Sequence, residues 1–141
     1  MKKIKIYFAG SIRGGREDME IYSNLIDFLG NYGTVLTEHV GHKNVEETVE
    51  VDKSDFAIYD QDIAWLRECD LLVAEVSHPS IGVGYEIGVA ESLGKKILCL
   101  YNEEAPKRLS AMLAGNDKIS TCFYNSIEHA KRCIGETLKN L

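Results

Sequence analysis

The chain has 141 residues, of which 45% are apolar and 27% charged, and its formal net charge is −6. This length predicts a single domain over residues 1–141, large enough to bury a core. The negative charge excludes a general attraction to nucleic-acid polymers or anionic membranes, so any bound phosphate must be held by local donors, as in a small-molecule site.

The first quarter of the chain predicts a strand, a helix and a second strand. Residues 3–9 ("KIKIYFA") form an apolar strand that runs into the glycine-rich turn "GSIRGG". Residues 17–32 predict a helix, because their apolar side chains recur at helical spacing, and Gly33 should end it. Residues 34–37 predict a short strand. Residues 38–52 are polar without a clear period, which indicates a loop.

The rest of the chain continues the alternation. Ser54 is a candidate N-cap for a helix over 55–69, and the aliphatic run 70–77 predicts a buried strand. There follow a turn at 78–84, a helix at 85–94, a strand at 95–101, a short helix at 105–113, a strand at 118–124 and a helix at 126–141. Alternating strands and helices predict an α/β fold, a three-layer Rossmann-like or flavodoxin-like sandwich with a five-stranded parallel sheet in the order 2-1-3-4-5. In that order ligands bind at the carboxyl ends of strands 1 and 3.

The four cysteines are widely spaced and none forms a CxxC pair: Cys69, Cys99, Cys122 and Cys133. We expect structural thiols in a reducing compartment. The start "MKKIKIYF" is too short and too soon polar for a signal peptide, and no run is long enough to span a membrane. The expected location is therefore cytoplasmic.

The turn after the first strand is a candidate anion site. Its glycines allow close backbone approach, Ser11 adds a hydroxyl, and Arg13 and Arg16 add forked donors suited to phosphate. The alternative is a tight turn whose arginines are merely solvated. The stretch is neither a Walker loop nor a GxGxxG turn.

Two carboxylates could act beside this turn. Glu86 follows "SHPSIGVGY", and we expect it in the first turn of a helix. It either faces the ligand-binding cleft at the carboxyl ends of strands 1 and 3 or only compensates the helix dipole. Asp62 lies one helical turn from both Ile58 and Leu66. It therefore either borders the apolar stripe of its helix or lies on a solvated face. A carboxylate pair, one nucleophile and one acid/base, suits retaining glycosyl transfer. Tyr7, which we expect at the end of the first strand, could hydrogen-bond the nucleophile. The histidines have no metal-ligand spacing, so we expect no metal.

Several of these stretches resemble the 2′-deoxynucleoside 5′-monophosphate N-glycosidase family, within the nucleoside 2-deoxyribosyltransferase superfamily. They are "YFAGSIRGGRED", "GTVLTEHV", "DQDIAWLRECDLLVAEVSHPSIGVGYEIG", "KKILCLY" and "LSAM", in order from residue 4 to about 124. The resemblance implies hydrolysis of the N-glycosidic bond to a free base and 2-deoxyribose 5-phosphate. It implies no cofactor.

The resemblance also implies roles for individual residues. Glu86 matches the nucleophile, Asp62 the acid/base and Tyr7 the tyrosine that positions the nucleophile. Ser110 matches a serine that reaches the phosphate from the neighbouring subunit, which implies a homodimer. The substrate-binding positions are Gly10, Ser11, Ile12, Arg13, Gly14, Ser80, Gly82, Ser110 and Met112.

Three other functions stay open at this point. A 2-deoxyribosyltransferase would use the same covalent chemistry, although the phosphate loop argues against it. A ribonucleotide (CMP-type) N-glycosidase is a second, because no residue here reports on the 2′ position. The third is a nucleotide-sensing module without catalysis.

Overall fold

The structure is a computed structural model that describes residues 3–12, 15–37 and 54–141. The predicted loop 38–52 and the predicted site residues Arg13 and Gly14 lie outside the described residues.

The centre of the fold is a parallel sheet whose strand order, β2-β1-β3-β4-β5, confirms the predicted topology. Its strands are β1 (Ile4–Gly10), β2 (Gly33–Val35), β3 (Leu71–Glu75), β4 (Lys96–Asn102) and β5 (Ser120–Tyr124). At the carboxyl edge, Gly10 of β1 pairs with Glu75 of β3, which pairs in turn with Leu100 of β4. The loops that follow these strands therefore meet at one edge, where open α/β sheets bind ligands.

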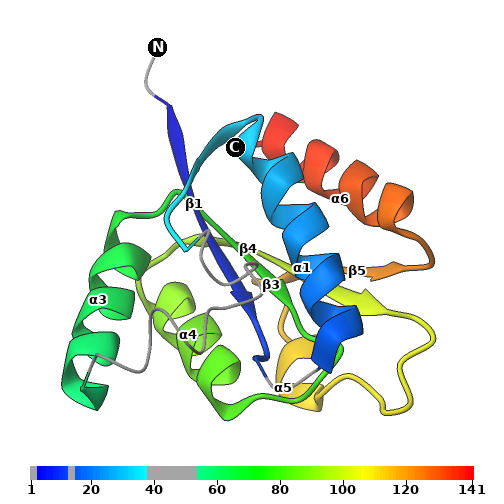
Figure 1. The fold of residues 1–141 in the computed structure, drawn as a ribbon, viewed down its shortest axis with the longest axis horizontal. Helices are drawn as coiled ribbons and strands as arrows, with labels where there is room; N and C mark the ends of the chain where they lie inside the picture. The colour runs from blue at the N-terminus through cyan, green and yellow to red at the C-terminus, as the bar shows by residue number, and fades with distance from the viewer. Residues whose placement is uncertain (1–2, 13–14, 38–53) are drawn as a thin grey trace.

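Helices cover both faces of the sheet and complete the three predicted layers (Figure 1). On one face lie α1 (Gly15–Gly30) and α6 (Ile127–Lys139), and on the other α3 (Asp55–Glu68) and α4 (Ile81–Ser92); α5 (Ala111–Ala114) is a single turn near the carboxyl edge. Each face has its own buried apolar cluster, because residues that alternate along a strand point to opposite faces. No helix among the described residues is long and apolar enough to cross a membrane.

The largest difference from the predicted elements concerns α4. This helix begins at Ile81, four residues before the predicted start, because the Ser80 side chain accepts a hydrogen bond from the Val83 N–H at 3.2 Å and caps it. Glu86 therefore lies in the second turn, and the first turn contains no acidic residue. The helix-dipole explanation of Glu86 loses its basis, since that effect fades within one turn.

Two smaller predictions about β1 and β2 were wrong. Tyr7 lies in the middle of β1, not at its end, and α1 ends at Gly30, not at Gly33. Gly33 instead begins β2 and pairs with Ile4. A Cβ on Gly33 would lie 2.4 Å from the Ile4 carbonyl oxygen, so glycine is required there by close strand approach.

The cysteines divide into two kinds. Cys69 and Cys99 are buried free thiols, as expected. Cys122 of β5 and Cys133 of α6 form a disulfide, so the expectation of four thiols was wrong. The short connection between β5 and α6 brings the two Cα atoms to 6.5 Å, a distance that a spacing of 11 residues does not reveal.

Candidate active site

The tyrosine and glutamate predicted to act together are in direct contact. Tyr7 projects from β1 toward the layer of α3 and α4, where it is only 1% exposed. Its hydroxyl donates a hydrogen bond to Oε2 of Glu86, a half-buried residue of α4. The contact joins residues 79 positions apart. It holds Oε2 of Glu86 in place, and Tyr7 does not bond the second carboxylate oxygen.

Burial adjusts the acidity of both partners. It raises the pKa of Glu86 from 4.5 to about 7; the hydrogen bond from Tyr7 opposes this increase, and the charge of Asp62 adds to it. Burial, followed by the charges of Glu86 and Asp62, raises the pKa of the Tyr7 hydroxyl well above its usual value. Tyr7 is therefore a permanent hydrogen-bond donor at neutral pH, whereas Glu86 can exist in both protonation states.

Asp62 completes this group of ionisable side chains. It is half-buried on α3, and its charge acts on both Tyr7 and Glu86. The structure thus brings together the three residues that the sequence analysis named as catalytic. Because the charge of Asp62 disfavours ionisation of Glu86, the two carboxylates can share one proton near neutral pH, and a pair that shares a proton can take different chemical roles.

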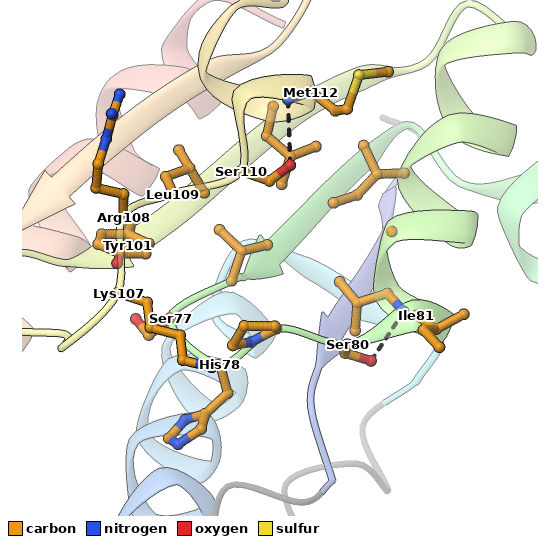
Figure 2. Close-up of a pocket in the computed structure, with 16 residues that line it drawn as sticks. Ser77, His78, Ser80, Ile81, Tyr101, Lys107, Arg108, Leu109, Ser110 and Met112 are labelled. Carbon is orange, nitrogen blue, oxygen red and sulfur yellow. Dashed lines mark hydrogen bonds between the residues drawn. The ribbon is translucent and has the colours of Figure 1, made fainter.

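A pocket of about 400 Å³ opens beside this group, at the carboxyl edge of the sheet (Figure 2). Ser80 lies on one side of it and Ser110 on the other, with Met112 next to Ser110, so three predicted substrate-binding residues share one cavity. Each serine caps a helix through its oxygen: Ser110 accepts from the Met112 N–H at 3.2 Å, as Ser80 does from Val83. Both hydroxyl hydrogens remain available as donors to a ligand.

The charge of the pocket lining favours an anion. Its remaining walls are mostly apolar, and the basic side chains that contribute are Lys107, Arg108 and His78; none of the described lining residues is a carboxylate. The sequence analysis missed these three residues. A signal existed in "PKRLS", where two cations lie two and three residues before Ser110.

The glycine-rich turn after β1 is described only at its two ends. A Cβ on Gly10 would lie 2.8 Å from the Tyr22 ring, so this residue lets the turn pass close to α1. Ser11 is buried, Ile12 is 38% exposed, and Gly15 opens α1 at a φ of 84°.

The group formed by Tyr7, Glu86 and Asp62 is connected to the pocket through α4, but none of these three residues lines the pocket. Ser80, Val83 and Ile87 of this helix line the pocket, whereas Glu86 contacts Tyr7. Gly82 is exposed at the start of α4 and does not line the pocket.

One group of potential metal ligands occurs in the described part of the chain, and it lies elsewhere. Cys122, His129 and Cys133 have ligand atoms within 4.8 Å of one another, on the side of the sheet covered by α6. Their two sulfur atoms form the disulfide, and the His129 Nδ1 accepts a hydrogen bond from the Asn125 N–H at 3.2 Å. This group does not contribute to the candidate active site.

Comparisons with known proteins agree with the resemblance seen in the motifs. The model of the nucleoside 2-deoxyribosyltransferase family matches residues 6–132. A protein of Tetraodon nigroviridis named 5-hydroxymethyl-dUMP N-hydrolase is 50% identical over 115 residues, which are 81% of each chain. A Danio rerio protein of the same name is 49% identical over 112 residues, covering 79% of this chain and 78% of the relative.

A solved structure has the same fold. The CMP N-glycosidase of Clostridium botulinum superposes with a TM-score of 0.69 and 23% identity, over 94% of this chain and 98% of that one. At this identity the likeness concerns the fold alone.

Proposed function

The chain belongs to the nucleoside 2-deoxyribosyltransferase family, and from this membership and the site geometry we propose that it hydrolyses the N-glycosidic bond of 2′-deoxynucleoside 5′-monophosphates. Relatives with about half of their residues identical are named N-hydrolases of a deoxynucleotide, which supports a nucleotide N-glycosidase. The observation that carries the mechanism is the hydrogen bond from Tyr7 to Glu86 next to Asp62.

In the first step, one oxygen of ionised Glu86 attacks C1′ of the deoxyribose. The step starts from the form of the pair in which Glu86 is ionised and Asp62 holds the shared proton. The C1′–N bond breaks, its electron pair leaves with the base, and Asp62 gives its proton to the base. The product is a deoxyribosyl ester of Glu86. Tyr7 holds the other carboxylate oxygen, so the attacking oxygen is oriented before substrate arrives.

In the second step, water replaces the enzyme at C1′. Asp62, now ionised, takes a proton from the water while the C1′–O bond to Glu86 breaks and the carboxylate is regenerated. The products are a free base and 2-deoxyribose 5-phosphate. A 2-deoxy sugar suits this route, because it lacks the electron-withdrawing 2′ oxygen that destabilises positive charge at C1′.

The 5′-phosphate is assigned to the pocket and the neighbouring glycine-rich turn. Ser80 and Ser110 offer hydroxyl donors, and Lys107 and Arg108 provide positive charge. Gly10, Ser11, Ile12, Arg13, Gly14, Gly82 and Met112 belong to the same proposed binding site. Phosphate binding of this kind would distinguish nucleotides from nucleosides.

The proposal includes a homodimer with a shared site. Large apolar side chains are exposed on α3, α4 and α5, close to the pocket: Phe56 at 76%, Tyr59 at 52%, Ile81 at 96%, Tyr85 at 56% and Met112 at 81%. Tyr59 of α3 and Tyr85 of α4 lie against each other with ring centroids 6.3 Å apart, and exposed apolar side chains that gather in this way typically mark a protein contact. Ser110 lines the pocket of its own chain, so whether it serves that pocket or its partner's needs a direct test.

Mixed dimers of Glu86→Gln and Ser110→Ala subunits provide this test. If Ser110 acts across the interface, one site of each mixed dimer combines an intact Glu86 with an intact Ser110, and mixing two impaired variants restores activity. If Ser110 acts within its own chain, every site has a defect and mixing restores nothing, which would refute the shared site.

The function itself is tested by following free base release from three groups of compounds. These are deoxynucleoside 5′-monophosphates including 5-hydroxymethyl-dUMP, the matching nucleosides, and ribonucleotides. We expect release from the deoxynucleotides, loss of release in Glu86→Gln, and full activity in Glu91→Gln, a matched change on the same helix whose glutamate bonds Asn116 instead. Release from nucleosides only, or base exchange in place of hydrolysis, would contradict the proposal.

The covalent step and the cellular location have their own measurements. Acid quenching during turnover should trap deoxyribose 5-phosphate on the peptide that contains Glu86, and mass spectrometry should find no adduct in Glu86→Gln. For the proposed cytoplasmic location, fractionation of cells should recover the protein with the cytosolic fraction, and recovery with membranes or the medium would contradict it.

A further inference from the structure

A second buried glutamate lies at the same edge of the sheet as the candidate active site, and the mechanism does not use it. Glu75 is the last residue of β3 and is 2% exposed. It follows Leu71 and Val73 at alternate positions, so its side chain faces the layer of α1 and α6, opposite to Tyr7 and Glu86. It therefore cannot reach the reacting atoms as a third catalytic carboxylate.

The Glu75 carboxylate is held by three protein donors. Its Oε1 accepts from the Ser77 N–H at 2.9 Å, and its Oε2 accepts from the Ser77 hydroxyl at 2.7 Å and from the Tyr124 hydroxyl. Burial raises the pKa of Glu75, and these hydrogen bonds partly oppose the increase. Within the described chain no cation forms an ion pair with it. The buried carboxylate carries a desolvation cost, and it is a common acceptor for Ser77, which follows β3, and for Tyr124 at the end of β5.

Ser77 connects this carboxylate to the loop after β4. Its hydroxyl donates to Glu75 and accepts from the Asn102 N–H at 2.7 Å, so its single donor is already used. The Asn102 carbonyl then accepts from the Ala105 N–H at 2.9 Å, three residues further along the loop toward Ser110. The loop after β3 contains Ser77 and leads to Ser80 three residues later.

We propose that Glu75 is a positioning residue for the phosphate subsite: through Ser77 it holds the loop that carries Ser80 and the loop that carries Ser110 on opposite sides of one pocket. Ser77 and both serines line this pocket, as Figure 2 shows. A further contact supports the same loop from α1, where the Asp18 carboxylate pairs with the His78 ring at 2.5 Å. The proposal rests on the proposed function, since it names what fixes the phosphate-binding end of that site.

The substitution Glu75→Gln tests the proposal, because glutamine has a similar volume but replaces one acceptor oxygen by a donor. That donor would face hydroxyl and amide donors, so the link to Ser77 should weaken. We expect KM for deoxynucleoside monophosphates to rise about tenfold, as when a hydrogen bond to a charged group is lost, with kcat little changed. Inhibition by inorganic phosphate should weaken by a similar factor. Residual cleavage of a nucleoside without phosphate should not change.

Two further variants keep the result interpretable. Ser77→Ala should reproduce the KM effect without any change of charge, whereas Glu91→Gln, which alters a hydrogen-bonded glutamate at the far end of α4, should not. Urea unfolding of each variant shows whether it remains folded. If Glu75→Gln fails to fold, Ser77→Ala carries the test alone.

The outcomes separate this inference from the function on which it rests. An unchanged KM in both Glu75→Gln and Ser77→Ala, in an enzyme that is active as wild type, refutes the positioning role only. An equal loss of kcat on nucleotides and nucleosides also refutes it, since that pattern marks a general structural defect. A wild-type protein that releases no base refutes the proposed function first.

Discussion

The substitution Glu86→Gln should make the folded protein more stable at neutral and alkaline pH while it abolishes turnover. The reason is the raised pKa of Glu86, which shows that its ionised form is disfavoured in the folded chain. Glutamine removes the charge and keeps an oxygen that can accept the Tyr7 hydrogen bond. The catalytic carboxylate is thus expected to lower stability in exchange for reactivity.

The size of the effect follows from the difference between the folded and unfolded pKa values. Burial raises the pKa of Glu86 from 4.5 to about 7, and each pH unit of difference corresponds to about 1.4 kcal/mol. Because Glu86 is only half-buried, solvent screening reduces the product to about 2–3 kcal/mol. A group with a raised folded pKa contributes no penalty below pH 4.5. The penalty grows as pH rises toward 7, and it is constant above that value.

Urea unfolding of wild type and Glu86→Gln at a series of pH values between 4 and 9 measures this penalty. Contributions of other titrating groups, including Glu75, cancel in the difference between the two proteins. The difference in free energy of unfolding should grow from its value at pH 4 by about 2–3 kcal/mol and level off above pH 7. A difference that does not depend on pH would refute the reasoning, and so would one that decreases as pH rises.

Two other predictions concern the active-site pKa and the sheet. Base release should show an acid limb in kcat/KM near the Glu86 pKa of about 7, because the nucleophile must be ionised. Tyr7→Phe should move that limb to higher pH, because it removes a hydrogen bond that lowers the Glu86 pKa, and Asp62→Asn should move it to lower pH, because it removes a charge that raises the Glu86 pKa. The pH–rate profiles of the residual activities measure both shifts. Shifts in the opposite directions would show that another group titrates. Gly33→Ala should lower the free energy of unfolding by about 2 kcal/mol or more, because its Cβ would lie 2.4 Å from the Ile4 carbonyl oxygen; an unchanged urea midpoint would mean that β1 and β2 separate at little cost.

Much of the fold could be read directly from local patterns. Alternating strands and helices predicted the parallel sheet and its order, which the structure confirms. Ser54 was named as a helix N-cap, and its side chain accepts a hydrogen bond from the Ala57 N–H at 3.1 Å. These features depend on interactions between residues a few positions apart, so local sequence patterns are sufficient to predict them.

The start of α4 shows how a local pattern can fail. The glycines of "SIGVGYE" indicated a turn, because glycine is a poor helix former. The helix nevertheless begins at Ile81, since the Ser80 cap and the burial of Val83 and Ile87 outweigh that preference. This early start gives Glu86 its place in the second turn, within reach of Tyr7.

The sequence by itself determined the architecture and the chemical types at the carboxyl edge: a glycine-rich turn, two carboxylates, and serines ahead of helices. Only the tertiary structure decided which of them meet. Tyr7 and Glu86 are 79 residues apart, Tyr124 and Glu75 49 apart, and Cys122 bonds Cys133 instead of remaining a thiol. Strand register and helix packing determine these pairings. Burial then determines the Glu86 pKa, because desolvation depends on all the groups packed around a side chain and not on its neighbours in the chain.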